Sequence, residues 1–276
     1  MSLPETILNT SAFARKSSSL IVALLLTLLQ AFCFAAQPLV KAPQIDMPMR
    51  VLFVGNSYFY YNDSLHNHVA RMLAIAEPLR EKRIDFKSAT IGGASLAQHN
   101  VDYLTQVGRL GVKQPFELVI LQGGSGEPLS ERRRAAFQRA VLEANQVVTS
   151  RGAKLALYMT PAYVAPHAHA RPENMRLTED AYVAVGNEVQ ALVIPVGLAF
   201  EEAYRRRPGL QLHNKIDGSH PSMAGTYLAA CTVLASVYGI SPVGNSYDYY
   251  GAIDRETAAF LQQVAYETVE RFFTAH

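Results

Sequence analysis

Short apolar runs recur along the chain, and longer amphipathic stretches separate them. This alternation constrains the fold more than any other feature of the sequence. Continuous apolar runs of this length, bounded by glycine or proline, are typical of strands that are covered on both faces. The five strand candidates cover residues 50–55, 84–91, 117–122, 154–159 and 191–196.

The stretches between these runs have the apolar periodicity of helices. Ser130 is a suitable N-cap for one of them, and Gly239 ends another as expected after a helix C-terminus. Strands that alternate with helices predict an α/β protein, here a three-layer α/β/α sandwich around a flavodoxin-like five-stranded parallel sheet. In such sheets ligands bind beyond the carboxyl ends of the strands. The expected helices cover residues 64–76, 130–150, 173–190, 221–238 and 255–273.

The N-terminal segment differs from the rest of the chain. Arg15 and Lys16 precede a nearly uncharged apolar run over 20–36 that ends in small residues, a pattern that predicts a secretory signal peptide over residues 1–36. The alternative is an uncleaved anchor helix, since the run is close to the lower length limit for crossing a bilayer. We therefore expect a single domain over 37–276, secreted or periplasmic, without stable membrane insertion after cleavage.

Composition excludes several classes of function for this domain. The formal net charge of the full chain, +2, is too small to indicate a nucleic-acid partner, and the basic runs at 131–134 and 205–207 are interpreted as solvated helix faces. Cys231 is the one cysteine after residue 36, so no intramolecular disulfide is expected. The sequence contains no CxxC pair, no HExxH motif, no P-loop and no GxGxxG motif, so we expect neither a metal nor a cofactor.

Polar residues of the types used in catalysis follow the first apolar run and precede the expected helix at 221–238. Ser57 lies in a strand-to-helix turn, where a serine is exposed above a sheet. Serine is a weak nucleophile without a base, and a neutral imidazole provides one near pH 7. His220 supplies that imidazole, and Asp217, three residues earlier, is placed to orient it. Each motif alone is equally typical of an ordinary turn.

Two further loops follow the second and third runs. Gly92 and Gly93 allow a backbone N–H to approach a substrate oxygen closely, as an oxyanion hole requires. Gln122 offers a side-chain amide donor and Ser125 a hydroxyl, and either is a candidate for a further donor. The alternative is that Gln122 only ties down its own loop.

Together these motifs resemble the SGNH/GDSL hydrolase superfamily over nearly the whole chain after the signal segment. The resemblance implies a serine esterase with Ser57 as nucleophile, and with His220 and Asp217 as base and orienting acid. It also implies backbone donors at Ser57 and Gly93 for the oxyanion. The most specific match is the sequence Asp-Gly-Ser-His-Pro at residues 217–221.

Two departures from the family pattern matter. Gly-Asn-Ser replaces the usual Gly-Asp-Ser at residues 55–57, and the third block lacks its usual asparagine. A glutamine at that strand end is similar to carbohydrate acetylesterase branches of the superfamily, such as sialate O-acetylesterase-like proteins. Gln122 is therefore our predicted third oxyanion donor, ahead of Ser125.

The expected substrate is a small-molecule or glycan ester with a small acyl group such as acetyl. Candidate substrate contacts are Tyr58, His99, Ser125 and Tyr163, although His99 is equally expected on the surface. The alternatives are a lipid esterase, a non-catalytic glycan-binding protein on the same fold, and, last, a flavodoxin-like cofactor binder. The His-x-His spacing at residues 167–169 suggests zinc, but no third ligand accompanies it.

Overall fold

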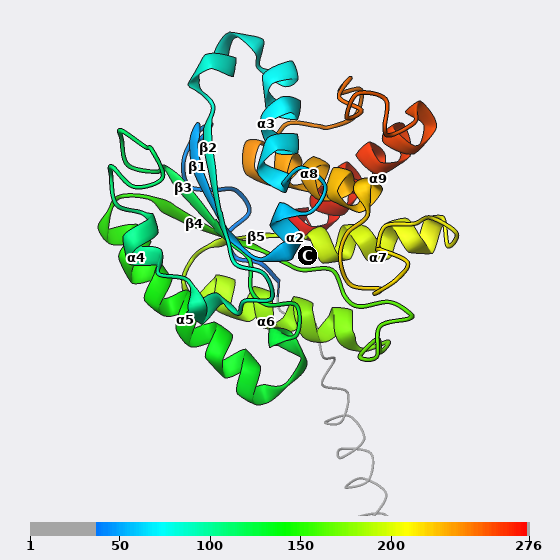
Figure 1. Ribbon diagram of the computed structural model, residues 1–276, viewed down its shortest axis with the longest axis horizontal. Coiled ribbons are helices and arrows are strands. Elements are labelled where there is room, and N and C mark those ends of the chain that lie inside the picture. Colours follow the sequence, from blue (N-terminus) through cyan, green and yellow to red (C-terminus); the bar gives the residue numbers. More distant parts are fainter. Residues whose placement is uncertain (1–36, 275–276) are drawn as a thin grey trace, which may run out of the picture. The chain divides into compact units, whose positions relative to one another are not determined.

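The computed structural model describes residues 37–274, and these form one parallel five-stranded sheet between two layers of helices (Figure 1). The strand order is β2-β1-β3-β4-β5, and every neighbouring pair is parallel. The predicted fold class is therefore confirmed, while the predicted signal segment lies outside the described residues. The strands are β1 (Arg50–Gly55), β2 (Asp85–Thr90), β3 (Leu118–Leu121), β4 (Lys154–Tyr158) and β5 (Leu192–Ile194).

Each of the five expected helices is present, with ends within about two residues of those predicted. They are α3 (Leu65–Ala76), α5 (Glu131–Ser150), α6 (Asn174–Glu188), α8 (Met223–Tyr238) and α9 (Arg255–Thr274). The helix α7 (Val196–Arg206) was not predicted; it begins directly after Pro195, which shortens the fifth strand. Short helical turns complete the structure: α2 (Ser57–Tyr60), η1 (Pro78–Arg83), η2 (Leu96–Gln98), α4 (Val101–Leu104) and η3 (Glu127–Leu129).

Alternating strand residues divide the interior into two cores. Val51 and Phe53 of β1 point into the core formed with α3, α7, α8 and α9. Leu52 and Val54 point to the opposite face, where α5 and α6 pack. This two-residue alternation, with both faces covered, explains why the inner strands β1 and β3 are almost entirely apolar. The edge strand β2 is less buried and carries Asp85 and Lys87.

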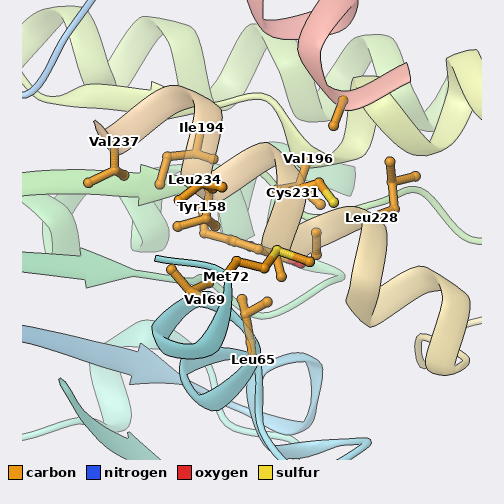
Figure 2. Close-up of a cluster of buried hydrophobic side chains, with 14 of the residues drawn as sticks. Leu65, Val69, Met72, Tyr158, Ile194, Val196, Leu228, Cys231, Leu234 and Val237 are labelled. Atoms are coloured by element: carbon orange, nitrogen blue, oxygen red, sulfur yellow. The ribbon is translucent and has the colours of Figure 1, made fainter. Parts of the chain in front are cut away.

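Helix α8 is buried around most of its circumference because α3, α7, α9 and the sheet surround it. Figure 2 shows Leu228, Cys231 and Leu234 of α8 packed close to Val69 and Met72 of α3. Cys231 is a fully buried free thiol.

The strand order determines where the polar loops meet. Since β1 lies between β2 and β3, the loops that follow these three strands emerge side by side at the carboxyl edge of the sheet. The loop after β4 joins them from the other side of β3. Over residues 37–274, no helix is both long and apolar enough to cross a membrane.

Candidate active site

Ser57 lies in the turn between β1 and α2, and it is 6% exposed. Asn56 caps this short helix, because its side-chain Oδ1 accepts a hydrogen bond of 3.2 Å from the backbone N–H of Tyr58. Ser57 is the first helical residue, so its own N–H has no acceptor within the helix. The turn therefore presents a hydroxyl and a backbone donor from the same residue.

Ser57, His220 and Asp217 form one hydrogen-bonded chain. The Ser57 Oγ lies 2.8 Å from Nε2 of His220, and Nδ1 of that ring lies 2.8 Å from Oδ2 of Asp217. A carboxylate only accepts, so Nδ1 carries the proton and Nε2 is left to accept from the serine hydroxyl. The three side chains thus lie together as expected, and this pairing favours the tautomer that a general base requires.

The turn that carries His220 is held by its own carboxylate. Oδ1 of Asp217 accepts from the backbone N–H groups of Ser219 (2.8 Å) and His220 (2.9 Å). Gly218 has φ +61°, and a Cβ there would lie 2.1 Å from the carbonyl oxygen of Val164. Only glycine permits both this conformation and this close approach.

The ionisation of Asp217 follows from these contacts. Partial burial raises the pKa of Asp217, but hydrogen bonds from the His220 ring and from the backbone of Ser219 and His220 lower it. The net pKa lies below its ordinary value, so the carboxylate is charged at neutral pH.

Aromatic rings hold the imidazole in place. Tyr61 stacks on His220 with ring centroids 4.3 Å apart and planes 8° from parallel. Tyr58 is buried, and its hydroxyl lies 2.8 Å from Oγ of Ser219 in the neighbouring turn. Tyr58 borders the cavity described below, but its main contacts support the His220 turn.

The loop after β2 is fixed against the nucleophile turn. The side-chain Nδ2 of Asn56 donates to the carbonyl oxygen of Ala94 at 3.0 Å. Gly93, the residue before, has φ +70° and lines the same cavity as Ser57. The asparagine that replaces the usual aspartate therefore connects the turn that carries Ser57 with the loop that carries Gly93.

The structure places Gln122 differently from our prediction. Its Oε1 accepts from the backbone N–H of Asn56 at 2.9 Å, and its Nε2 donates to the carbonyl oxygen of Gly123. The side chain is 1% exposed and does not line the cavity. The predicted oxyanion role of Gln122 is therefore corrected. Both polar atoms of its side-chain amide bond to backbone groups beneath the turn, which matches the alternative that Gln122 ties down its loop.

This position of Gln122 leads to a testable prediction. Gln122→Leu should lower the free energy of unfolding by about 1–3 kcal/mol, because the buried N–H of Asn56 loses its acceptor. We expect kcat to fall by less than about tenfold, against the 10²–10³-fold typical of a lost oxyanion donor. Urea unfolding and steady-state kinetics measure the two effects. If the variant kept its stability but had a hundredfold lower kcat, Gln122 would be an oxyanion donor after all.

The side chains at the carboxyl edge of the sheet surround a cavity of about 830 Å³. Ser57 and His220 line it together with Gly93, Ser125 and Tyr163. The hydroxyl groups of Ser125 and Tyr163 lie 2.8 Å apart and bridge the loops after β3 and β4. Ser125, our second choice for an oxyanion donor, and Tyr163, a predicted substrate contact, thus both line the cavity.

Three other histidines lie away from the hydrogen-bonded chain or at its margin. His99 does not line this cavity; it is half-buried beside a smaller pocket between η2 and α5, so its predicted substrate contact is wrong. His167 lines the cavity and stacks on Tyr163 with centroids 3.7 Å apart. His169 neighbours His167, but within residues 37–274 no group of three potential metal ligands converges there or elsewhere.

Sequence reasoning missed the basic residues of the site. Arg132, Arg133 and Arg139 of α5 are exposed, as the predicted solvated helix face implies for the run at 131–134, but they also line the cavity. The run at 205–207 instead makes ion pairs on the surface, since Arg205 and Arg206 both bind the carboxylate of Glu202. The period of α5 places the three cavity residues on one side of the helix, but no sequence signal shows which side faces a cavity.

Comparison with solved structures identifies proteins of the same fold. A protein provisionally described as an SGNH hydrolase, from Slackia heliotrinireducens, is 24% identical with a TM-score of 0.55, over 68% of this chain and 98% of its own. An acetyl xylan esterase is 16% identical with a TM-score of 0.51, over 68% and 98% of the two chains. A lipase/acylhydrolase from Enterococcus faecalis is 19% identical with a TM-score of 0.52, over 69% and 96%.

No family model matches the chain, and no curated protein matches it. The structural likeness nevertheless covers nearly the full length of each of the three proteins. The resemblance to SGNH/GDSL hydrolases is therefore confirmed at the level of the fold.

Proposed function

We propose that this chain, which has the SGNH hydrolase fold, is a serine esterase that removes small acyl groups such as acetyl from carbohydrate. One observation carries the proposal. The hydrogen-bonded chain from Ser57 through His220 to Asp217 borders a large cavity at the carboxyl edge of the sheet. A serine hydroxyl in this arrangement is activated for attack on a carbonyl carbon.

Acylation uses all three side chains. Ser57 Oγ attacks the ester carbonyl carbon while Nε2 of His220 accepts the hydroxyl proton. Asp217 holds the ring and stabilises the imidazolium that forms. The tetrahedral intermediate collapses, and the leaving alcohol takes the proton from His220. Water then attacks the acyl-enzyme with His220 again as base, which releases the acid and restores the serine.

Backbone N–H groups of Ser57 and Gly93 stabilise the oxyanion in this mechanism. The Ser57 donor is unpaired within its helix, and Gly93 lies in the loop that Asn56 holds in place. Fixed donors of this kind contribute about 3–4 kcal/mol each to transition-state stabilisation in other serine hydrolases. Ser125 is the one hydroxyl from the third loop that lines the cavity and completes our proposed set.

The cavity chemistry favours a sugar ester over a long-chain lipid. Hydroxyl, amide and guanidinium groups line much of the cavity, and Tyr163 provides an aromatic surface on which a sugar ring can stack. A structural neighbour is named for the hydrolysis of acetyl xylan. Another is named a lipase/acylhydrolase, so a lipid ester is the second candidate to test.

Acyl-group preference tests this proposal. We expect the purified protein to hydrolyse p-nitrophenyl acetate and to release acetate from O-acetylated oligosaccharides, with little turnover of p-nitrophenyl palmitate. If only the long-chain ester were hydrolysed, the protein would be a lipid esterase and not a carbohydrate esterase. Glycan binding without hydrolysis of any ester would instead indicate a binding protein.

Export is also part of the proposal, and the basic and apolar segment within residues 1–36 supports it. N-terminal sequencing of the protein recovered from outside the cytoplasm should begin near residue 37. An N-terminus at Met1 in that fraction would indicate a retained segment.

A further inference from the structure

Three arginines of α5 face the cavity that contains Ser57. Arg132, Arg133 and Arg139 all line it, with Ala136 between them on the same side of the helix. Within residues 37–274, none of the three guanidinium groups forms an ion pair with a carboxylate. Arg134, the next residue in the run, differs because it donates to the carbonyl oxygen of Pro128 and lies away from the cavity.

Helix energetics do not explain this arrangement. The first turn of a helix favours acidic side chains, because the backbone dipole places partial positive charge there. In α5 a single acid, Glu131, is followed at once by three consecutive arginines at residues 132–134. Neighbouring like charges at a positive helix end oppose one another, and a bound anion would relieve that repulsion.

The nearby carboxylates do not neutralise the arginines. Glu127 lines the cavity, but its Oε2 accepts from the backbone N–H groups of Gly124 (2.5 Å) and Leu96 (3.3 Å). Burial raises the pKa of Glu127 above its ordinary value, although these hydrogen bonds and the charge of Arg133 oppose the rise. The carboxylate of Asp217 is bound to His220 and to its own turn. The cavity wall formed by α5 is therefore electropositive.

We infer that the ester substrate carries a carboxylate, as an acidic sugar does, which Arg132, Arg133 and Arg139 bind while Ser57 attacks the ester. This inference rests on the proposed esterase function. A guanidinium binds a carboxylate through two parallel hydrogen bonds, which makes arginine better suited than lysine to this role. An acetyl group occupies little of the 830 Å³, so the charge belongs to the alcohol part of the ester.

A substrate pair that differs in one charge tests the inference. The pair is a mono-O-acetylated methyl glucuronoside and the corresponding uronamide, which has the same shape without the charge. At low ionic strength we expect kcat/KM for the acid to exceed that for the amide by about tenfold. Because the arginines are exposed, salt should reduce this ratio. In the triple variant R132Q/R133Q/R139Q the ratio should fall to about one.

The ratio is measured within each variant, so a general loss of activity cancels. Arg176→Gln is the matched control: it removes one arginine charge from α6, outside the cavity, and should keep the wild-type ratio. Wild-type protein that hydrolyses p-nitrophenyl acetate but shows an acid-to-amide ratio near one would overturn the inference and leave the esterase proposal intact. Wild-type protein that hydrolyses no ester would overturn both.

Discussion

Ser57→Ala is expected to reduce kcat for p-nitrophenyl acetate by about 10⁵–10⁶-fold, the loss typical of serine hydrolases that lose their nucleophile. No other described hydroxyl lies within hydrogen-bond distance of Nε2 of His220, so no neighbour can replace it. The backbone of the turn is held by Asn56 and Gln122 and not by the serine hydroxyl. The fold should therefore persist, with a change in unfolding free energy of about 1 kcal/mol or less.

Ser150→Ala provides the matched control for this experiment. Ser150 is exposed at the end of α5, and its hydroxyl bonds only to the carbonyl oxygen of Val147. We expect wild-type kinetics from it. Ser57→Ala protein that is folded by circular dichroism and retains more than about 1% of wild-type kcat would contradict the assignment of the nucleophile.

Asp217→Asn should reduce kcat by about 10⁴-fold, because an amide donor next to Nδ1 of His220 favours the wrong tautomer. In that tautomer Nε2 carries the proton and cannot accept one from Ser57. The asparagine oxygen can still accept from the backbone N–H groups of Ser219 and His220, so the turn keeps its hydrogen bonds. Kinetics and thermal unfolding of the same preparation separate the two effects.

Asp217→Ala is the informative comparison, because it removes the ring partner and the acceptor for the turn together. We expect similar inactivity but a lower melting temperature than Asp217→Asn, since two backbone N–H groups lose their acceptor. A kcat for Asp217→Asn within tenfold of wild type would mean that another group orients His220.

The strands were predictable because burial on both faces leaves a continuous apolar run, as at 50–55 and 154–158. The helix at 223–238 was predictable from its apolar pattern and from Gly239, which has the left-handed conformation expected after a helix C-terminus. Helix α7 was not, because only Pro195 separates it from β5 and its first residue, Val196, continues the apolar run of the strand. Apolar pattern alone does not separate a strand from a buried helix that continues it.

The hydrogen-bonded chain was predictable because an aspartate three residues before a histidine, in a tight turn, can reach the ring nitrogen that a general base must have oriented. The positions of Gln122 and of the cavity arginines were not predictable. Gln122 turns away from the cavity because its side-chain amide forms hydrogen bonds with the backbone of Asn56 and Gly123. These hydrogen bonds depend on how closely the ends of β1 and β3 pack, which the sequence does not show. The arginines at 132 and 133 could not be assigned until the side of α5 that faces the cavity was known.

Active-site labelling tests the central claim most directly. A fluorophosphonate reacts with a serine hydroxyl only where a base activates it, and mass spectrometry of the digest identifies the modified residue. We predict one phosphonyl group per chain, on the peptide that contains Ser57, and none on folded His220→Ala protein. Modification of a different serine, or an unmodified Ser57 in folded wild-type protein, would contradict the account.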